Sequence, residues 1–494
     1  MKKNTFKTTT LCLAVLLLIA GSSCGGGDAV DESTDTATAT QAVQTEAGEG
    51  VLAGAEPLPE TDLGGMELRI ATPDQGVLSW ANILLDADED GTPVNDAIAK
   101  RNRILEEQYH FSIQVESLPD FETGYLYNAV MAGDDAYDLC QIYDVRLLYT
   151  LELIDAWDNI PYVQLDAPWW NPEASACFNI NGSQIMTAGN MTLGYLSRSM
   201  CYLFNKTIYS SLGFDENLYE LVLDGKWTQD VFFRMAADAV SDLNGDGAYD
   251  ASDRYGTFGN PRAYYNTIFY GSGLSYVERG SDGLYEFTLH ENESTVSLFE
   301  KILSFDSSNP NRTYYNNRSD MHPSTLDPNT LFESGQALFH VQGLPHTIEG
   351  LRAMDDEFGI IPLPKADEAQ KDYYTTAYGA AVTVLPRTVP EDRYEAIGLL
   401  TEAMTRYTYK EIVPIYKEVL LKTKYSRDNE SSEMLDIVFS SIRFDPGILI
   451  WCNEIPDDIC ANIFMKGNNA VVSYLEKNLP VYQDKIDLFN EQMQ

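Results

Sequence analysis

Three observations predict an α/β fold for this chain. Segments of alternating apolar residues are followed by segments with apolar residues at helical spacing, the pattern of a largely parallel sheet covered by helices. Hydrophobic residues make up 44% of the 494 residues, which is enough for a large core. A chain of this length normally divides into two or more domains, and the strand–helix pattern starts a second time near residue 201.

The first series of elements begins near Asp62. Met66, Leu68 and Ile70 alternate as a first strand, and apolar residues over 94–109 then recur at helical spacing. A second strand is expected over 111–115, and a short helix separates it from a third strand over 139–142.

The second series begins with a strand over 201–204. Thr228 is expected to cap a helix with an apolar inner face. An irregular stretch follows from about 264 to 327. Further strands are expected at 337–339 and 359–361, and the chain from about Glu391 is mainly helical by its period.

The N-terminus has the pattern of an export signal. Met1-Lys2-Lys3 precedes an apolar run over 11–20, and small residues lead to Cys24. The run is too short to cross a hydrocarbon core of ~30 Å. Residues 1–23 are therefore interpreted as a signal peptide similar to that of bacterial lipoproteins, with Cys24 lipidated after cleavage. Gly21 stands where such signals usually carry Leu, so cleavage by the ordinary signal peptidase and release is the alternative.

Residues 24–61 are predicted to be a disordered acidic tether, because they contain almost no large apolar side chains. The net charge of −42 argues against nucleic acid and against anionic lipid as partners. Attachment to the membrane would then come from the lipid alone, with the body on the extracellular face of the cell membrane.

The segment 242–253 has the pattern of a twelve-residue calcium loop. Oxygen ligands stand at positions one, three, five, nine and twelve, glycine stands at six, and the backbone carbonyl of position seven completes the set. The expected ligands are Asp242, Asn244, Asp246, Ala248, Asp250 and Asp253. With Asp at position twelve, the segment resembles the calcium loops of dockerin modules. A structural Ca²⁺ is predicted, and a surface turn that binds nothing is the alternative.

The cysteines after Cys24 show no CxxC pair of a zinc or redox site. Cys452 and Cys460 are close enough in sequence for a short disulfide, although buried thiols are the preferred interpretation.

Seven short motifs, taken in order, resemble the family 1 extracellular solute-binding proteins of bacterial ABC importers. They span the chain from about residue 62 and stand at 63–69, 94–97, 132–139, 203–206, 225–228, 332–337 and 361–364. The resemblance implies a two-lobed periplasmic-binding-protein-like fold of type II. It also implies a monomeric protein that delivers a small solute to an ABC permease. It places lobe 1 at 62–195 plus 338–375 and lobe 2 at 196–337 plus 376–494. Hinge crossings are expected near 191–199, 337–343 and 373–379.

A sugar is the expected solute, since aromatic rings can stack on its CH faces and carboxylates can bind its hydroxyls. The chain has 30 Tyr and 6 Trp, so position along the chain selects the candidates. Ordinary core packing is the alternative for each of them. The candidates are Trp80, Tyr143, Asp144, Tyr264, Tyr378 and Trp451.

No catalytic residues are expected. The 5 histidines are isolated, and the chain has neither a Gly-x-Ser-x-Gly elbow nor a phosphate loop. The 75 acidic residues offer many carboxylate pairs of the kind that hydrolyse glycosides, so an exported calcium-containing glycoside hydrolase or another carbohydrate-active enzyme is the alternative. A structural envelope lipoprotein is a further alternative, and peptides or other polar solutes remain open.

Overall fold

The computed structural model describes most of the chain from residue 54 onward. The described residues are 54–73, 84–118, 124–142, 153–180, 182–247, 252–259, 261–289, 293–308, 313–315, 328–344, 351, 354–377, 380–422, 429–451 and 454–492.

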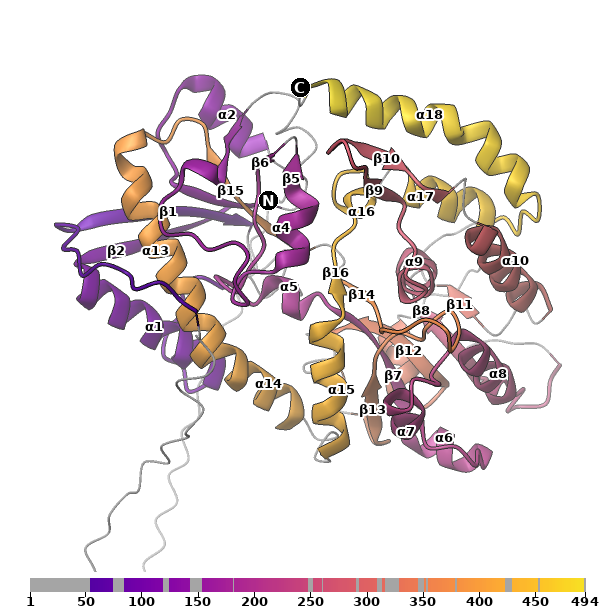
Figure 1. Cartoon of the computed structure of the whole chain (residues 1–494). Helices are drawn as coiled ribbons and strands as arrows, with labels where there is room; N and C mark the ends of the chain where they lie inside the picture. Colours follow the sequence, from indigo (N-terminus) through magenta and orange to yellow (C-terminus); the bar gives the residue numbers. More distant parts are fainter. Residues whose placement is uncertain are drawn as a thin grey trace, which may run out of the picture. The chain divides into compact units, whose positions relative to one another are not determined.

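The first sheet has five strands in the order β2-β1-β3-β15-β4. β1 (Met66–Pro73) pairs in parallel with β2 (Phe111–Leu118) and with β3 (Leu139–Ile142), which confirms the three predicted strands. α1 (Pro93–Tyr109) connects the first two. β15 (Val382–Pro386) lies antiparallel between β3 and β4 (Ile154–Asp155), so the late part of the chain completes the early sheet (Figure 1).

The second sheet has the order β11-β8-β12-β7-β13 and is mixed (Figure 1). β7 (Met200–Asn205) is antiparallel to both β12 (Ala337–Gly343) and β13 (Phe358–Ile361). β8 (Tyr255–Gly259) is parallel to β12 and to β11 (Thr313–Tyr315). The predicted parallel character therefore holds for only part of this sheet.

Helices fill most of the remaining chain, and the C-terminal part is helical as expected. They are α2 (Gly124–Ala132), α4 (Pro172–Phe178), α5 (Gly194–Ser197), α6 (Lys206–Leu212), α7 (Leu218–Leu223), α8 (Gln229–Ala239), α9 (Pro261–Gly271), α10 (Glu293–Ser308), α11 (Pro328–Glu333), α13 (Tyr394–Tyr407), α14 (Val413–Lys422), α15 (Asn429–Ser440), α16 (Pro446–Leu449), α17 (Pro456–Ile459) and α18 (Val471–Gln492). None of those in the described ranges combines the length and apolar content that a membrane span requires.

Strand pairing corrects the predicted distribution of the chain between lobes. β12 and β13 were expected in lobe 1, but their ladders join β7 in the second sheet, with Phe339 opposite Phe204. β15 was expected in lobe 2, but it pairs with β3 in the first sheet. Residues Gly48–Gln494 form one compact unit, so the division into two lobes stays a prediction.

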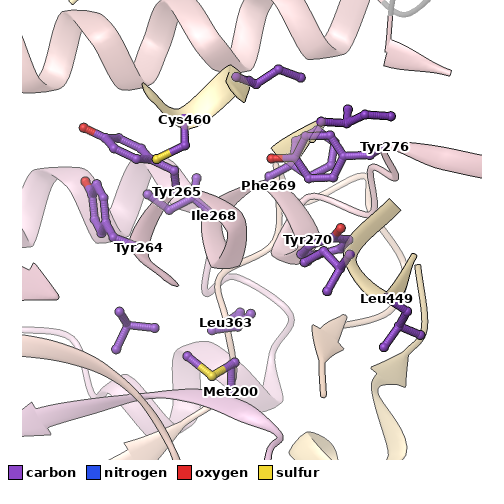
Figure 2. Close-up of a cluster of buried hydrophobic side chains, with 14 of the residues drawn as sticks. Met200, Tyr264, Tyr265, Ile268, Phe269, Tyr270, Tyr276, Leu363, Leu449 and Cys460 are labelled. Carbon is purple, nitrogen blue, oxygen red and sulfur yellow. The ribbon is translucent and has the colours of Figure 1, made fainter. Parts of the chain in front are cut away.

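The core is rich in aromatic rings around α9. Figure 2 shows Tyr264, Tyr265 and Ile268 of α9 in one buried cluster with Cys460. Trp227 belongs to the same core, because it is fully buried and its indole N–H donates to the Pro362 carbonyl at 2.9 Å.

The described cysteines are buried thiols. Cys140, Cys177, Cys201 and Cys460 form no disulfide, which agrees with the preferred interpretation, and Cys452 lies outside the described residues.

Candidate functional site

Two of the predicted hinge segments lie side by side. Ser199 and Ala377 form an antiparallel bridge, and the Thr375 hydroxyl donates to the Met200 carbonyl at 2.5 Å. Beside them, β14 (Thr375–Thr376) pairs in parallel with β16 (Ile442–Arg443). We call residues 191–199, 373–377 and 440–445 the crossing region. The expected crossing at 337–343 is wrong, because that segment is β12, a central strand of the second sheet.

Backbone and amide hydrogen bonds join the segment just before the first crossing to the first sheet. Thr187 N–H donates to the Thr383 carbonyl at 3.1 Å, and Thr383 N–H donates back at 2.8 Å. The Gln141 amide of β3 donates to the Thr383 hydroxyl at 2.7 Å. The side-chain amide of Asn190, just before the first crossing, donates to the Trp169 carbonyl at 2.9 Å and so has a structural role.

Arg101 of α1 joins four segments at the start of the first crossing. The side chain is fully buried, and burial lowers its pKa to about 10. Its guanidinium donates to the Met191 carbonyl at 3.0 Å, the Thr408 hydroxyl at 2.9 Å and the Leu85 carbonyl at 2.7 Å. The Asn102 amide oxygen accepts from Nε and Nη2. All five N–H groups thus have acceptors, and the residue is a structural clamp.

Arg198 brings a positive charge to the point where β12 ends. Only 9% of this residue is exposed, and its Nη1 lies 3.5 Å from the position that a Cβ on Gly343 would occupy. In open α/β sheets, ligands bind beyond the carboxyl ends of strands, and Gly343 is such an end. Sequence reasoning included Arg198 in the first crossing without naming it, although a lone charge among small and apolar residues was a usable signal.

A pocket of about 480 Å³ adjoins the β14–β16 pair. We call it the β14–β16 pocket. Its lining comes from α4, the segment 371–374, the end of α15 and β16. Arg443 lies over the Tyr374 ring, with the guanidinium carbon 3.9 Å from the ring centroid. The Tyr373 hydroxyl donates to the Val222 carbonyl at 2.9 Å.

The structure describes two of the six predicted ligand residues, Tyr264 and Trp451. Trp80, Tyr143, Asp144 and Tyr378 lie outside the described residues. Tyr264 is fully buried in α9, with its ring 5.0 Å from that of Tyr265.

Trp451 is also a core residue. It is 4% exposed and packs edge-on against Tyr285 at 5.8 Å and Phe489 at 5.2 Å. For Tyr264 and Trp451 the packing alternative therefore replaces the predicted ligand contact.

The structure describes residues 242–247 and 252–253 of the predicted calcium loop, so Ala248 and Asp250 lie outside the described residues. The Asp242 carboxylate accepts the N–H of Gly245 at 2.6 Å and of Gly247 at 2.9 Å, and Gly247 has a φ of 80°. Asp253 is buried, and its carboxylate accepts Leu243 N–H at 2.9 Å. Asn244 and Asp246 are exposed and hydrogen-bond to each other. Within the described ranges, no three His, Cys, Asp or Glu residues gather as a metal site.

Sequence comparisons identify no relatives. No protein-family model matches the chain, and no curated protein sequence matches it.

Solved structures do match over most of the chain. The ABC substrate-binding protein Lmo0181 from Listeria monocytogenes, in complex with cycloalternan, is 16% identical with a TM-score of 0.51, covering 86% of this chain and 98% of its own. The galacto-N-biose-/lacto-N-biose I-binding protein of Bifidobacterium longum, in complex with lacto-N-biose, is 14% identical with a TM-score of 0.54, covering 87% and 99%. UgpB from Mycobacterium tuberculosis, in complex with glycerophosphocholine, is 15% identical with a TM-score of 0.52, covering 81% and 98%.

Similarity at these identities establishes architecture alone. The two sheets, the long helix α18 and the near-complete coverage of each solved chain agree with one another. This chain therefore has the type II periplasmic-binding-protein fold of the solute-binding proteins of ABC transporters.

Proposed function

We propose that this protein is an extracytoplasmic solute-binding protein that captures an oligosaccharide or a similarly sized polar solute and delivers it to an ABC importer. The observation that carries the proposal is a fold shared with solved binding proteins over more than four fifths of the chain. Two of the three compared proteins were solved with sugars and one with glycerophosphocholine, which favours a hydroxyl-rich solute. The role is binding without catalysis.

The crossing region supports a hinge in this proposal. A short bridge at Ser199 and Ala377, flanked by longer ladders in each sheet, is a place where small changes in backbone angles reorient large elements. A solute that contacts the elements on both sides would then stabilise a closed form. The amide and backbone bonds at Thr383 and the clamp of Arg101 would keep the ends of the hinge segments in place.

Among the residues that the structure describes, we propose that Arg198 binds the solute. A guanidinium donates several hydrogen bonds in one plane and suits adjacent hydroxyl oxygens or a phosphate. We expect Arg198→Gln to weaken solute binding about tenfold, since a hydrogen bond from a charged group contributes ~1.5–3 kcal/mol. Arg103→Gln is the matched control, because Arg103 is exposed and pairs with Glu89 on the surface of α1.

The test is calorimetric titration with a panel of mono- and oligosaccharides, glycerophosphocholine and short peptides. Binding of a sugar that Arg198→Gln weakens and Arg103→Gln does not would support the proposal. Binding of peptides alone would contradict the solute class. Release of new reducing ends from a polysaccharide would show an enzyme instead and overturn the proposed function.

We also propose that Cys24 carries the lipid that holds the protein at the outer face of the cell membrane. The proposal depends on the signal pattern described above. Cys24→Ser should shift the protein from the membrane fraction to the medium. An unchanged distribution, or an N-terminal mass without acyl chains, would favour cleavage by the ordinary signal peptidase.

We propose a structural Ca²⁺ in the 242–253 loop. The fit is partial: Gly247 makes the turn that such a loop needs and Asp253 closes it, whereas Asn244 and Asp246 bond to each other. Calcium at millimolar concentration should raise the melting temperature, and EDTA should reverse the change. Asp253→Asn should abolish the response and the exposed Asp230→Asn on α8 should keep it. A calcium response retained in Asp253→Asn would contradict the assignment.

A further inference from the structure

The β14–β16 pocket combines charges of both signs with an aromatic wall. Arg443 and Lys371 supply two positive groups, and Glu173 and Asp372 supply two negative groups. All four side chains are exposed, and no ion pair joins them to one another in the part of the chain that the structure describes. Opposite charges in one pocket that do not pair leave both signs available to an occupant.

Arg443 is held in position by the ring beneath it. The guanidinium carbon is 3.9 Å from the centroid of Tyr374, which is a close cation–π contact. Stacking uses the face of the guanidinium and leaves its N–H groups free to point outward in the plane. A planar edge of this kind matches a carboxylate, which accepts two parallel N–H bonds.

The elements beside the pocket pack on each other. Phe178 of α4 packs edge-on against Phe444, which follows β16, with the ring centroids 5.9 Å apart. The β14–β16 ladder and the buried Ser441, whose hydroxyl donates to the Val438 carbonyl at 2.9 Å, complete that side. Glu173 on α4 and Arg443 on β16 are therefore presented by elements that pack on each other.

The volume and the charge pattern select a class of ligand. A pocket of about 480 Å³ lies in the range of small-molecule sites. An anion would be repelled by Glu173 and Asp372, and a cation by Lys371 and Arg443. A neutral sugar would use neither sign of charge. A zwitterion satisfies both signs with one molecule.

We propose that the β14–β16 pocket binds a small zwitterion, a free amino acid or a dipeptide, whose carboxylate pairs with Arg443 and whose ammonium group pairs with Glu173. This site is additional to the solute site at Arg198. Because the pocket lies in the crossing region, its occupant contacts the segments that the proposed hinge would move.

The experiment is calorimetric titration of the full chain with glycylglycine and a panel of free amino acids. The same compounds with an acetylated amine or an amidated carboxylate serve as matched ligands that lack one charge. We expect at least one zwitterion to bind, and each blocked analogue to bind at least tenfold more weakly. Arg443→Gln and Glu173→Gln should each weaken binding of the zwitterion by at least tenfold, and Arg103→Gln should leave it unchanged.

Several outcomes would overturn this inference. Equal binding of blocked and free compounds, retention of binding in Arg443→Gln and Glu173→Gln, or no zwitterion bound at millimolar concentration would each do so. Loss of sugar binding in Arg443→Gln would assign the pocket to the solute and overturn the inference while leaving the proposed function intact. Melting temperatures of the variants within about 1 °C of the parent would show that folding is not the cause.

Discussion

Replacing Glu402 by alanine should destabilise the protein more than any surface change on the same helix. Glu402 of α13 is fully buried, and its carboxylate accepts the indole N–H of Trp169 at 2.6 Å and of Trp170 at 2.7 Å. Nε of Arg406 donates to the same carboxylate at 2.7 Å. With the backbone N–H of Gln164 at 3.3 Å, four donors converge on one side chain, so a single truncation leaves all of them without this acceptor.

The magnitude follows from what remains after the change. The Arg406 side chain is only 10% exposed, and removing one partner of a buried ion pair costs about 3–5 kcal/mol. The two indole N–H groups add to this, although water entering the cavity offsets part of the loss. We expect the free energy of unfolding to fall by about 5 kcal/mol. Unfolding of ~450 residues carries an entropy near 0.9 kcal/mol/K, so the melting temperature should fall by about 5 °C.

Urea titration followed by tryptophan fluorescence measures the change. Glu395→Ala is the control, since Glu395 lies on the same helix but is exposed and accepts one hydrogen bond, from Tyr162. Its effect should stay within about 0.5 kcal/mol. A loss below about 1 kcal/mol for Glu402→Ala, or an equal loss in the two variants, would refute the reasoning.

Three further predictions concern the core. Gly398→Ala places a Cβ 2.0 Å from the Pro161 carbonyl oxygen and should cost about 2–3 kcal/mol in urea titration; a loss below about 0.5 kcal/mol would be inconsistent with the overlap. Burial raises the pKa of Asp445 from 3.8 to about 6, so the free energy of unfolding should fall by about 3 kcal/mol in total as the pH rises from about 3 to about 7. Asp445→Asn should remove that pH dependence, and a stability difference between variant and parent that is equal at pH 4 and pH 7 would contradict it. Trp227→Phe leaves the Pro362 carbonyl without its donor and should lower the melting temperature by about 2 °C; an unchanged value would show the bond to be dispensable.

Local periodicity was sufficient to predict individual strands and helices of the fold. Met66, Leu68 and Ile70 alternate because one side of β1 packs under helices, and that pattern is visible in sequence. Sheet order was not visible in the same way. β15 joins β3, more than two hundred residues earlier, through backbone bonds that leave no local pattern, and the lobe assignment was wrong there.

The candidate site shows the same limit. Tyr264 and Trp451 were chosen because aromatic rings serve sugars, but rings also fill cores, and sequence does not separate the two uses. The residues that the structure brings to the crossing region, such as Arg198 and Arg443, come from segments far apart in the chain. The spacing of residues along the sequence does not show which distant segments lie close together in the fold.

The position of β15 has a consequence for biogenesis. β15 ends at residue 386, so β3 has no partner strand on that side until this part of the chain has been synthesised. Until then the N-terminal strands have an open edge, and closing it requires a contact of high sequence separation, which is slow. The first sheet is therefore among the last parts of the fold that can be completed, although its strands β1, β2 and β3 come first in the chain.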